Sequence, residues 1–410
     1  MAMIRPFKAV RPADRYAHRI AALPYDVYNR AEAKAEVDKE PLSFLKIDRA
    51  ETQLADSVDT YADAVYDKAR ETYLEMKKEG YFIQDQNACF YLYELTMNGR
   101  TQTGIVGCAS IDDYESGVIK KHENTRADKE ADRIRHVDEM SAQTGPIFLS
   151  YHADRTLSDL MERIKKGLPV NDFTSPDGIR HRVWIVDGSD DIRTIEERFA
   201  VIGNVYIADG HHRCASAVRV GQKRRNEHPG YSGREEFNMF LSVLFPDEEL
   251  MIMDYNRVIK DKCGHTHEEI IDFLKRKGKL VEQSSAFHPS KKGECGIYMD
   301  HQWYAFAFDG SIRSDDPVAG LDVSVLQNEI LQPLFGINDP KTDHRIEFIG
   351  GIRGLEELER RVDTDCVIAF AMYPTQIEEL FAVADAGKLM PPKSTWFEPK
   401  LRSGLFIHEI

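Results

Sequence analysis

The segment that most constrains the fold of this chain lies near its middle, at residues 205–218, and reads Val-Tyr-Ile-Ala-Asp-Gly-His-His-Arg-Cys-Ala-Ser-Ala-Val. Its first residues are apolar and suited to a β-strand, whereas its alanine-rich end favours a helix. The order therefore predicts a strand, a tight turn at Asp209 and Gly210, and then a helix. With the strand and helix patterns on either side, it predicts an α/β protein with mixed sheets.

The predicted turn has the properties of an anion-binding site. The first N–H groups of a helix have no partner within the helix, and the helix dipole places positive charge there. His211, His212 and Arg213 add donor groups, Gly210 allows a close approach of the backbone, and Asp209 offers an oxygen for Mg²⁺ or a hydroxyl. The segment therefore predicts a phosphate site. The competing interpretation is an ordinary Asp-Gly turn followed by a solvated first helical turn.

Two other roles for the same segment are less favoured. Asp209, His211 and His212 offer ligands for a transition metal, but adjacent histidines point in different directions on a helix. Cys214 is either a reactive thiol near a helix N-terminus or a small buried residue, and we favour the second.

Length and composition limit the classes of protein that fit. A chain of 410 residues is too long for one ordinary core, and we expect three parts, at residues 1–112, 113–246 and 247–410. The formal net charge of −15 argues against binding to nucleic acid. Because the chain has neither an apolar membrane span nor a signal-peptide pattern, we expect a cytoplasmic protein without a membrane partner. Six scattered cysteines predict reduced thiols.

Periodicity predicts further elements along the chain. Residues 55–79 have helical spacing and end before Gly80. Residues 89–96 and 101–109 are strand-like and are joined through Asn98-Gly99, which is a strong hairpin signal. In the last part we expect strands at 254–259 and 366–372, a hairpin at 296–308, and helices at 267–277, 322–331 and 376–386.

A cluster of charged residues precedes the phosphate-site turn. A short predicted strand is followed by Lys121, His122 and Glu123, and then by the helical stretch 128–140. A carboxylate among cations stays ionised and can accept a proton, so Glu123 is a candidate general base. On the helix, the spacing of i, i+4 and i+7 places three basic residues on one face, where they either serve the site or form a solvated surface. These residues are Lys129, Arg133 and His136.

The C-terminal tail contains too many prolines for a helix. Lys393, Ser394 and Thr395 offer a cation and two hydroxyls, which suits either a phosphate or carboxylate clamp or a plain surface loop. The glycine-rich stretch 348–354 contains neither of the common nucleotide-binding fingerprints.

The motifs resemble those of a known superfamily. Asp209-Gly-His-His-Arg213 resembles the signature turn of ParB/sulfiredoxin-like proteins and, among them, most resembles that of the free L-serine kinases. Lys121-His122-Glu123 and Gly387–Thr395 look like the kinases' Lys-Pro-His-Glu and Gly-Glu-x-x-x-Pro-Lys-Thr-Thr segments, in the same order. Over its full length the chain resembles the bacterial and archaeal family of unknown function numbered 1015. The interval between the first two motifs is longer than in compact serine kinases, and the part before Asp113 looks additional.

The resemblance implies a ParB/sulfiredoxin-like catalytic core and a small-molecule kinase that forms O-phospho-L-serine with Mg²⁺ and a donor, which is ATP, ADP or pyrophosphate. Glu123 would be the base on the serine hydroxyl, and Asp209 would help to hold Mg²⁺. The oligomeric state stays open, including a homo-oligomer. The implied residues are Glu123, Asp209 and His211 for catalysis; Lys121, Arg133, Gly210, His211, His212 and Arg213 for the donor; and His122, Lys393, Ser394 and Thr395 for the substrate.

Two rival functions follow from the same superfamily. A ParB-like nucleotide-binding regulator would carry a basic face or a helix-turn-helix, which the acidic composition does not favour. A sulfiredoxin-like thiol reductase would need its cysteine at position 211, where this chain has His211.

Overall fold

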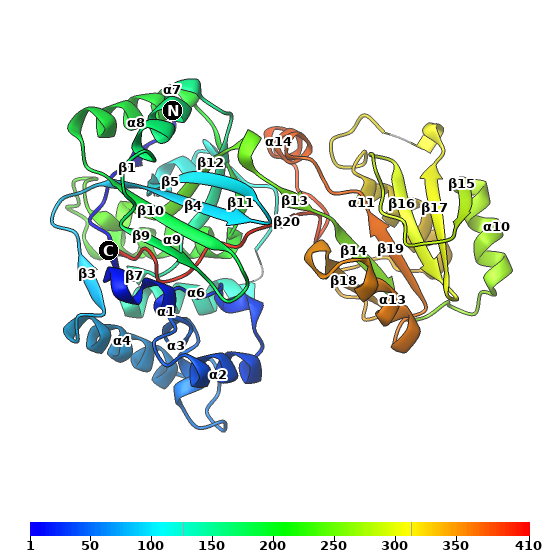
Figure 1. The fold of residues 1–410 in the computed structure, drawn as a ribbon, viewed down its shortest axis with the longest axis horizontal. Coiled ribbons are helices and arrows are strands. Elements are labelled where there is room, and N and C mark those ends of the chain that lie inside the picture. Colours follow the sequence, from blue (N-terminus) through cyan, green and yellow to red (C-terminus); the bar gives the residue numbers. More distant parts are fainter. Residues whose placement is uncertain (126, 313) are drawn as a thin grey trace. The chain divides into compact units, whose positions relative to one another are not determined.

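The computed structural model describes residues 1–125, 127–312 and 314–410. The chain divides into two compact units (Figure 1). The first unit consists of Met1–Leu250 together with Pro399–Ile410, and the second consists of Met251–Glu398.

The first unit is built on a nine-stranded mixed sheet. Strand β11 runs parallel to β6, and β12 runs parallel to β8, whereas the other neighbours are antiparallel. The order across the sheet is β6 (Ile119–Lys120), β11 (Val205–Asp209), β8 (Ile147–Tyr151), β12 (Met239–Pro246), β5 (Arg100–Ser110), β4 (Phe90–Met97), β10 (Arg180–Val186) and β9 (Asn171–Thr174), with β1 (Ile4–Arg5) also paired to β5. The predicted mixed α/β class is confirmed.

The hairpin of β4 and β5 forms where the Asn-Gly signal predicts it. Asn98 has a φ of 51° and Gly99 a φ of 80°. Two consecutive positive φ values match the twist of paired strands, and Asn and Gly tolerate them best. The hairpin places two long, buried strands at the centre of the sheet.

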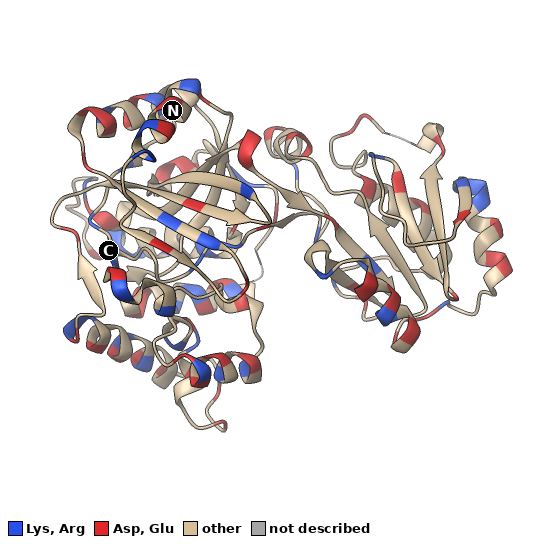
Figure 2. Ribbon diagram, in the orientation of Figure 1, with Lys and Arg blue, Asp and Glu red and all other residues tan. Residues whose placement is uncertain are grey.

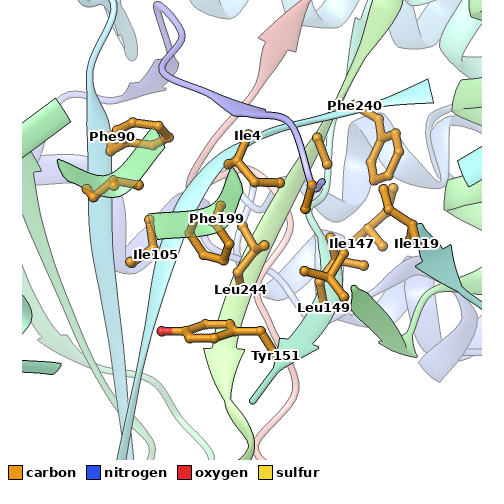
Figure 3. Packing of buried hydrophobic residues seen from close by; sticks show 14 of the residues in the cluster. Ile4, Phe90, Ile105, Ile119, Ile147, Leu149, Tyr151, Phe199, Phe240 and Leu244 are labelled. Atoms are coloured by element: carbon orange, nitrogen blue, oxygen red, sulfur yellow. The ribbon is translucent and has the colours of Figure 1, made fainter. Parts of the chain in front are cut away.

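The core of this sheet is an apolar cluster between the strands and the helices packed on them. Figure 3 shows side chains from β1, β4, β5, β8 and β12 around Phe199 of α8. Leu157 and Leu160 of α7 and Cys214 and Val218 of α9 belong to the same cluster. The helices of the unit are α1 (Ala17–Ile20), α2 (Arg30–Lys39), α3 (Leu45–Asp48), α4 (Asp63–Lys78), α5 (Ile111–Glu115), α6 (Ala127–Met140), α7 (Arg155–Ile164), α8 (Ser189–Ile202) and α9 (His211–Glu227).

A second apolar cluster joins the N-terminal helices to the end of the chain. It contains residues of α2, α3, α4 and β3 (Phe82–Gln84), together with Val10 of β2 (Val10–Pro12) and Ile407. Helix α4 starts at Asp63, later than the predicted start at residue 55, because residues 59–62 form a turn in which the Asp59 side chain accepts a hydrogen bond from the Tyr61 amide. Its end before Gly80, with a φ of 76°, is as predicted.

The C-terminal segment returns to the first unit. Strand β21 (His408–Glu409) pairs with β7 (Ala142–Gln143), and Glu409 accepts hydrogen bonds from Tyr73 and Lys77 of α4. The two units therefore differ from the three expected parts. Strands of residues 1–112 and 113–246 share one sheet, and the end of 247–410 joins that unit.

The second unit contains an antiparallel sheet with the order β15 (Gly278–Gln283), β17 (Gln302–Phe308), β16 (Glu294–Met299), β19 (Ile368–Met372), β14 (Tyr255–Ile259) and β18 (Ile346–Gly350). A short ribbon pairs β13 (Ile252–Met253) with β20 (Trp396–Phe397). Its helices are α10 (His267–Lys277), α11 (Asp322–Leu326), α12 (Gln332–Phe335), α13 (Leu355–Thr364) and α14 (Ile377–Asp385).

Charged residues of both signs occur together on the outer helices. Figure 2 shows Lys or Arg alternating with Asp or Glu along α2, α4 and α13, while most strand residues are uncharged. Within the described residues, no helix is long and apolar enough to cross a membrane.

Candidate functional site

The site is built on the turn between β11 and α9. Gly210 adopts the left-handed conformation, with φ 90° and ψ 30°, and its amide donates a hydrogen bond to Oδ1 of Asp209 at 2.8 Å. Helix α9 starts directly after it, and in the described chain no side chain caps its first turn. The predicted strand, turn and helix are confirmed, and the first N–H groups of α9 remain suited to an anion.

Asp209 is held by a lysine from the other end of the chain. Nζ of Lys400 lies 2.8 Å from Oδ2 of Asp209, and the two side chains are 19% and 46% exposed respectively. Burial favours the neutral carboxyl, but Lys400, the Gly210 amide and His211 together outweigh it, and the pKa of Asp209 lies below its ordinary value. Asp209 is therefore ionised at neutral pH.

Two buried histidines lie beside Glu123. The rings of His122 and His211 pack edge to face, with centroids 4.5 Å apart, and Nδ1 of His211 lies 4.0 Å from Oε2 of Glu123. Burial lowers the pKa of His122 to about 4, against the opposing effects of Asp209 and of a hydrogen bond to the Ile207 backbone. Burial and the neighbouring His122 hold the pKa of His211 well below its ordinary value. Both imidazoles are neutral at pH 7.

Each histidine has an unused buried nitrogen. Nδ1 of His122 and Nε2 of His211 have no hydrogen-bond partner among the described residues. Such a group costs about 1–3 kcal/mol when it is left unsatisfied. The free Nδ1 of His122 is an acceptor, because the proton of this ring is donated to the Ile207 backbone. A metal ion, or a ligand that offers a donor to Nδ1 of His122 and an oxygen to Nε2 of His211, would satisfy both, which distinguishes this cluster from a solvated helical turn.

The structure gives a different set of candidate metal ligands from the set considered from the sequence. Possible ligand atoms of His122, Glu123 and His211 lie within 4.8 Å of one another. The sequence-based alternative combined Asp209, His211 and His212 instead. The structure brings in His122 and Glu123 because β6 runs parallel to β11, so that the residues after both strands lie at one edge of the sheet.

The two arginines of the predicted donor site contact residues of the N-terminal part. Nη2 of Arg213 donates to Oδ2 of Asp48 and to Oγ of Ser403, both at 3.1 Å. Arg133 forms an ion pair with Asp132 at 2.8 Å. Both guanidinium groups lie over the ring of Tyr25, at 4.0 Å for Arg133 and 5.2 Å for Arg213. Their role toward a phosphate remains a prediction.

Of the other predicted residues, Lys121 and His212 are close enough to the cluster to lower the pKa of His211, and the rest lie in the second unit. Lys121 is exposed, with Nζ 5.5 Å from the Tyr114 ring, and His212 is half-buried. Lys393, Ser394 and Thr395 belong to the second unit. There the Arg257 side chain donates to the Lys393 carbonyl, and the Ser394 hydroxyl donates to the Pro391 carbonyl, so this loop is ordered by its own unit.

Three contact residues of the site were not identified from the sequence. Lys400 lies among prolines and other basic residues of the tail, and no pattern links it to Asp209. Asp48 is fully buried and accepts hydrogen bonds from Thr144 at 2.7 Å and from Arg213. Tyr25 lies in a short 3-10 helix, Tyr25–Val27, and no sequence pattern predicts its contact with the site.

Comparisons with known proteins give one family model and several solved structures of low similarity. A family model described as "Protein of unknown function (DUF1015)" matches residues 4–324. A free serine kinase in complex with AMP is 15% identical, covers 74% of this chain and 92% of its own, and has a TM-score of 0.34. A mutant of free serine kinase in complex with ADP is 14% identical, covers 75% and 93%, and has a TM-score of 0.35.

A conserved hypothetical protein from Pyrococcus furiosus is 16% identical, covers 74% of this chain and 94% of its own, and has a TM-score of 0.34. No curated protein matches the chain.

Proposed function

This chain belongs to the DUF1015 family of proteins of unknown function, and we propose that it is a phosphotransferase that moves a phosphoryl group from ATP, ADP or pyrophosphate to the hydroxyl of free L-serine. The observation that carries the proposal is the uncapped N-terminus of α9 beside two neutral histidines with unused buried nitrogens, an ionised Asp209 and the carboxylate of Glu123.

Phosphoryl transfer depends on positioning and on neutralising charge, more than on covalent chemistry by the protein. The N–H groups of α9 and an Nε2–H of His211 would donate to phosphate oxygens, whereas the proton of His122 is used in its hydrogen bond to the Ile207 backbone. A neutral imidazole can donate in this way without repelling a cation bound nearby. Glu123 would accept the proton of the serine hydroxyl as the oxygen attacks phosphorus.

Asp209 fits a role as one ligand of Mg²⁺. Its two oxygens are engaged by the Gly210 amide and by Lys400, but each carboxylate oxygen has a second lone pair, and the side chain is 46% exposed. Mg²⁺ usually takes one or two carboxylates and completes its shell with water and phosphate oxygens. When bound, Mg²⁺ would neutralise charge on the donor phosphates. Lys400 would keep Asp209 ionised for this purpose.

The direct test is phosphorus NMR of the purified protein with Mg²⁺ and L-serine, in separate tubes with ATP, ADP or pyrophosphate. We expect a new phosphomonoester signal, matched to authentic O-phospho-L-serine, in at least one tube. If no tube gives product and the donor signals are broadened by binding, the activity proposal is wrong and a nucleotide-binding regulator becomes the better interpretation.

The role of Glu123 is tested with Glu123→Gln, which keeps the size of the side chain but removes its basicity. We expect turnover to fall by about 10²–10⁴-fold, while the Kd for the donor changes by no more than about twofold. Glu139→Gln, at an exposed position of α6, is the matched control and should keep full activity. A Glu123→Gln variant with the wild-type rate would exclude this residue as the base.

A further inference from the structure

A separate cavity lies in the first unit, between α6 and the N-terminal segment. Its volume is about 170 Å³, and a cavity of about 150 Å³ is known to hold a molecule of six carbon atoms. Helix α6 contributes Lys129, Asp132, Arg133 and His136, and the facing wall includes Tyr25 and Asp26. The three basic residues predicted to share one face of this helix therefore line one cavity.

Most charges on the cavity wall are already compensated by ion pairs. Arg133 pairs with Asp132 at 2.8 Å, and Arg49 pairs with Glu51 at 2.6 Å. The buried Asp48, which also lines the cavity, pairs with Arg213 at 3.1 Å. Burial and the nearby Arg133 lower the pKa of His136 to about 4, so that its ring is neutral.

Two charged residues of the cavity wall, one basic and one acidic, do not take part in these ion pairs. Among the side chains that the structure describes, which do not include that of Asp128, neither Lys129 nor Asp26 has a hydrogen-bond or ion-pair partner. Asp26 is exposed and Lys129 is half-buried, so both can meet a molecule that enters from solvent. A ligand with only an anionic group would leave Asp26 unmatched, whereas a zwitterion would match both groups.

We propose that this cavity binds a free amino acid as its zwitterion, with the carboxylate at Lys129 and the ammonium group at Asp26. Its use as the acceptor site rests on the proposed phosphotransferase function. The wall residue Tyr25 also contacts Arg213 of the first turn of α9, with the guanidinium 5.2 Å from the ring. The cavity therefore adjoins the candidate phosphate site, and the N-terminal part supplies the substrate pocket.

The test measures binding by calorimetry to the full-length protein without any donor. Three probes separate the two charges: L-serine, ethanolamine, which lacks the carboxylate, and 3-hydroxypropionate, which lacks the ammonium group. We expect Lys129→Gln to weaken binding of L-serine and 3-hydroxypropionate about tenfold or more and to leave ethanolamine unchanged. Asp26→Asn should weaken L-serine and ethanolamine and leave 3-hydroxypropionate unchanged.

Controls separate recognition from loss of structure. Lys129→Arg should restore binding of the carboxylate-containing probes. Lys34→Gln removes a half-buried lysine of α2 that pairs with Asp56, and it should change no affinity. Absence of L-serine binding to the wild-type protein, or equal effects of a variant on all three probes, would overturn the proposal. Inorganic phosphate that binds where L-serine does not would identify an anion site instead.

The outcomes also separate this proposal from the proposed activity. If L-serine binds with the expected charge pattern but no phosphoserine forms, the activity is wrong and the amino-acid site stands. If phosphoserine forms but both variants keep the wild-type KM for L-serine, the activity stands and the cavity is not the acceptor site.

Discussion

Lys400 controls the charge of Asp209 and thereby the acid side of the pH profile. Burial alone would raise the pKa of this carboxyl, and Lys400 is the main cause of its decrease. In Lys400→Met the pKa of Asp209 should rise, because the effect of burial remains. Any step that needs the ionised carboxylate is then lost at a higher pH as the solution is acidified. We expect the acidic limb of kcat/KM to move by about one pH unit or more toward neutral pH.

The same shift has a consequence for stability. A carboxyl with a lowered pKa stabilises the fold above its unfolded pKa, and this stabilisation is lost as the pH falls through the folded pKa. Lys400→Met should therefore melt at a lower temperature than the wild type at pH 7, and the difference should shrink in acid. Lys34→Met, which breaks an exposed pair, serves as the control. An unchanged pH profile for Lys400→Met would show that Asp209 does not act in its ionised form.

Individual residues of the site differ in whether the sequence could predict them. His122, Glu123, Asp209 and His211 were identified because each lies in a compact motif, and the structure gathers them. Lys400 is 191 residues from Asp209, and Asp48 is 165 residues from Arg213. Long-range ion pairs leave no local pattern, since any of the many lysines or aspartates would fit the chemistry.

The turn between β11 and α9 depends on the conformation of one glycine. A Cβ at Gly210 would lie 3.7 Å from the Ile147 backbone, which is ordinary contact, so the cost of Gly210→Ala is the positive φ of 90°. This strain is worth about 1–2 kcal/mol, or a decrease in Tm of about 2–8 °C for a unit of this size. Relaxing it would rotate the first turn of α9, and we expect activity to fall about tenfold or more.

Gly80, after α4, provides the matched control. Its φ is 76°, and a Cβ there would meet no atom within 4 Å. Gly80→Ala should show a similar decrease in Tm by differential scanning calorimetry but keep full activity. Equal loss of activity in both variants would mean that Gly210 acts only through stability.

At the scale of elements, the sequence predicts a helix limit or a turn correctly where particular residues favour one backbone conformation. The hairpin at Asn98-Gly99, the turn at Gly210 and the limits of α10 follow from residues that favour one conformation. The start of α4 was wrong because Asp59 forms a competing hydrogen bond, which helical periodicity does not show. Sheet order was beyond prediction, since every buried strand has the same apolar character.

At the scale of the whole molecule, the C-terminal segment completes the first unit. Leu405, Phe406 and Ile407 are almost fully buried, and Phe406 packs against Tyr91 and Tyr93 of the central sheet. Burying three such side chains is worth roughly 5 kcal/mol or more, which is a large share of the 5–15 kcal/mol that stabilises a typical protein. The chain leaves this unit after Leu250 and re-enters it at Pro399.

Two deletions test this organisation. Replacing residues 251–398 by a short Gly-Ser linker should leave the first unit folded, because both of its apolar clusters and its whole sheet remain. The linker has little distance to span, since β13 and β20 pair next to the two crossing points. Truncation after Glu398 removes Lys400 and the buried segment, and we expect it to lower the Tm sharply or to prevent folding.

Circular dichroism melting and limited proteolysis of the two proteins distinguish these outcomes. A cooperative transition in the linker variant together with its loss in the truncated protein would establish that the last twelve residues belong to the fold of the first unit. A truncated protein as stable as the wild type would contradict this. Removing Leu405, Phe406 and Ile407 exposes the apolar surface that they cover, and this exposure would then not lower the stability of the unit. In that case the contact that Lys400 makes with Asp209 in the full-length protein would also contribute nothing measurable to the stability of the unit.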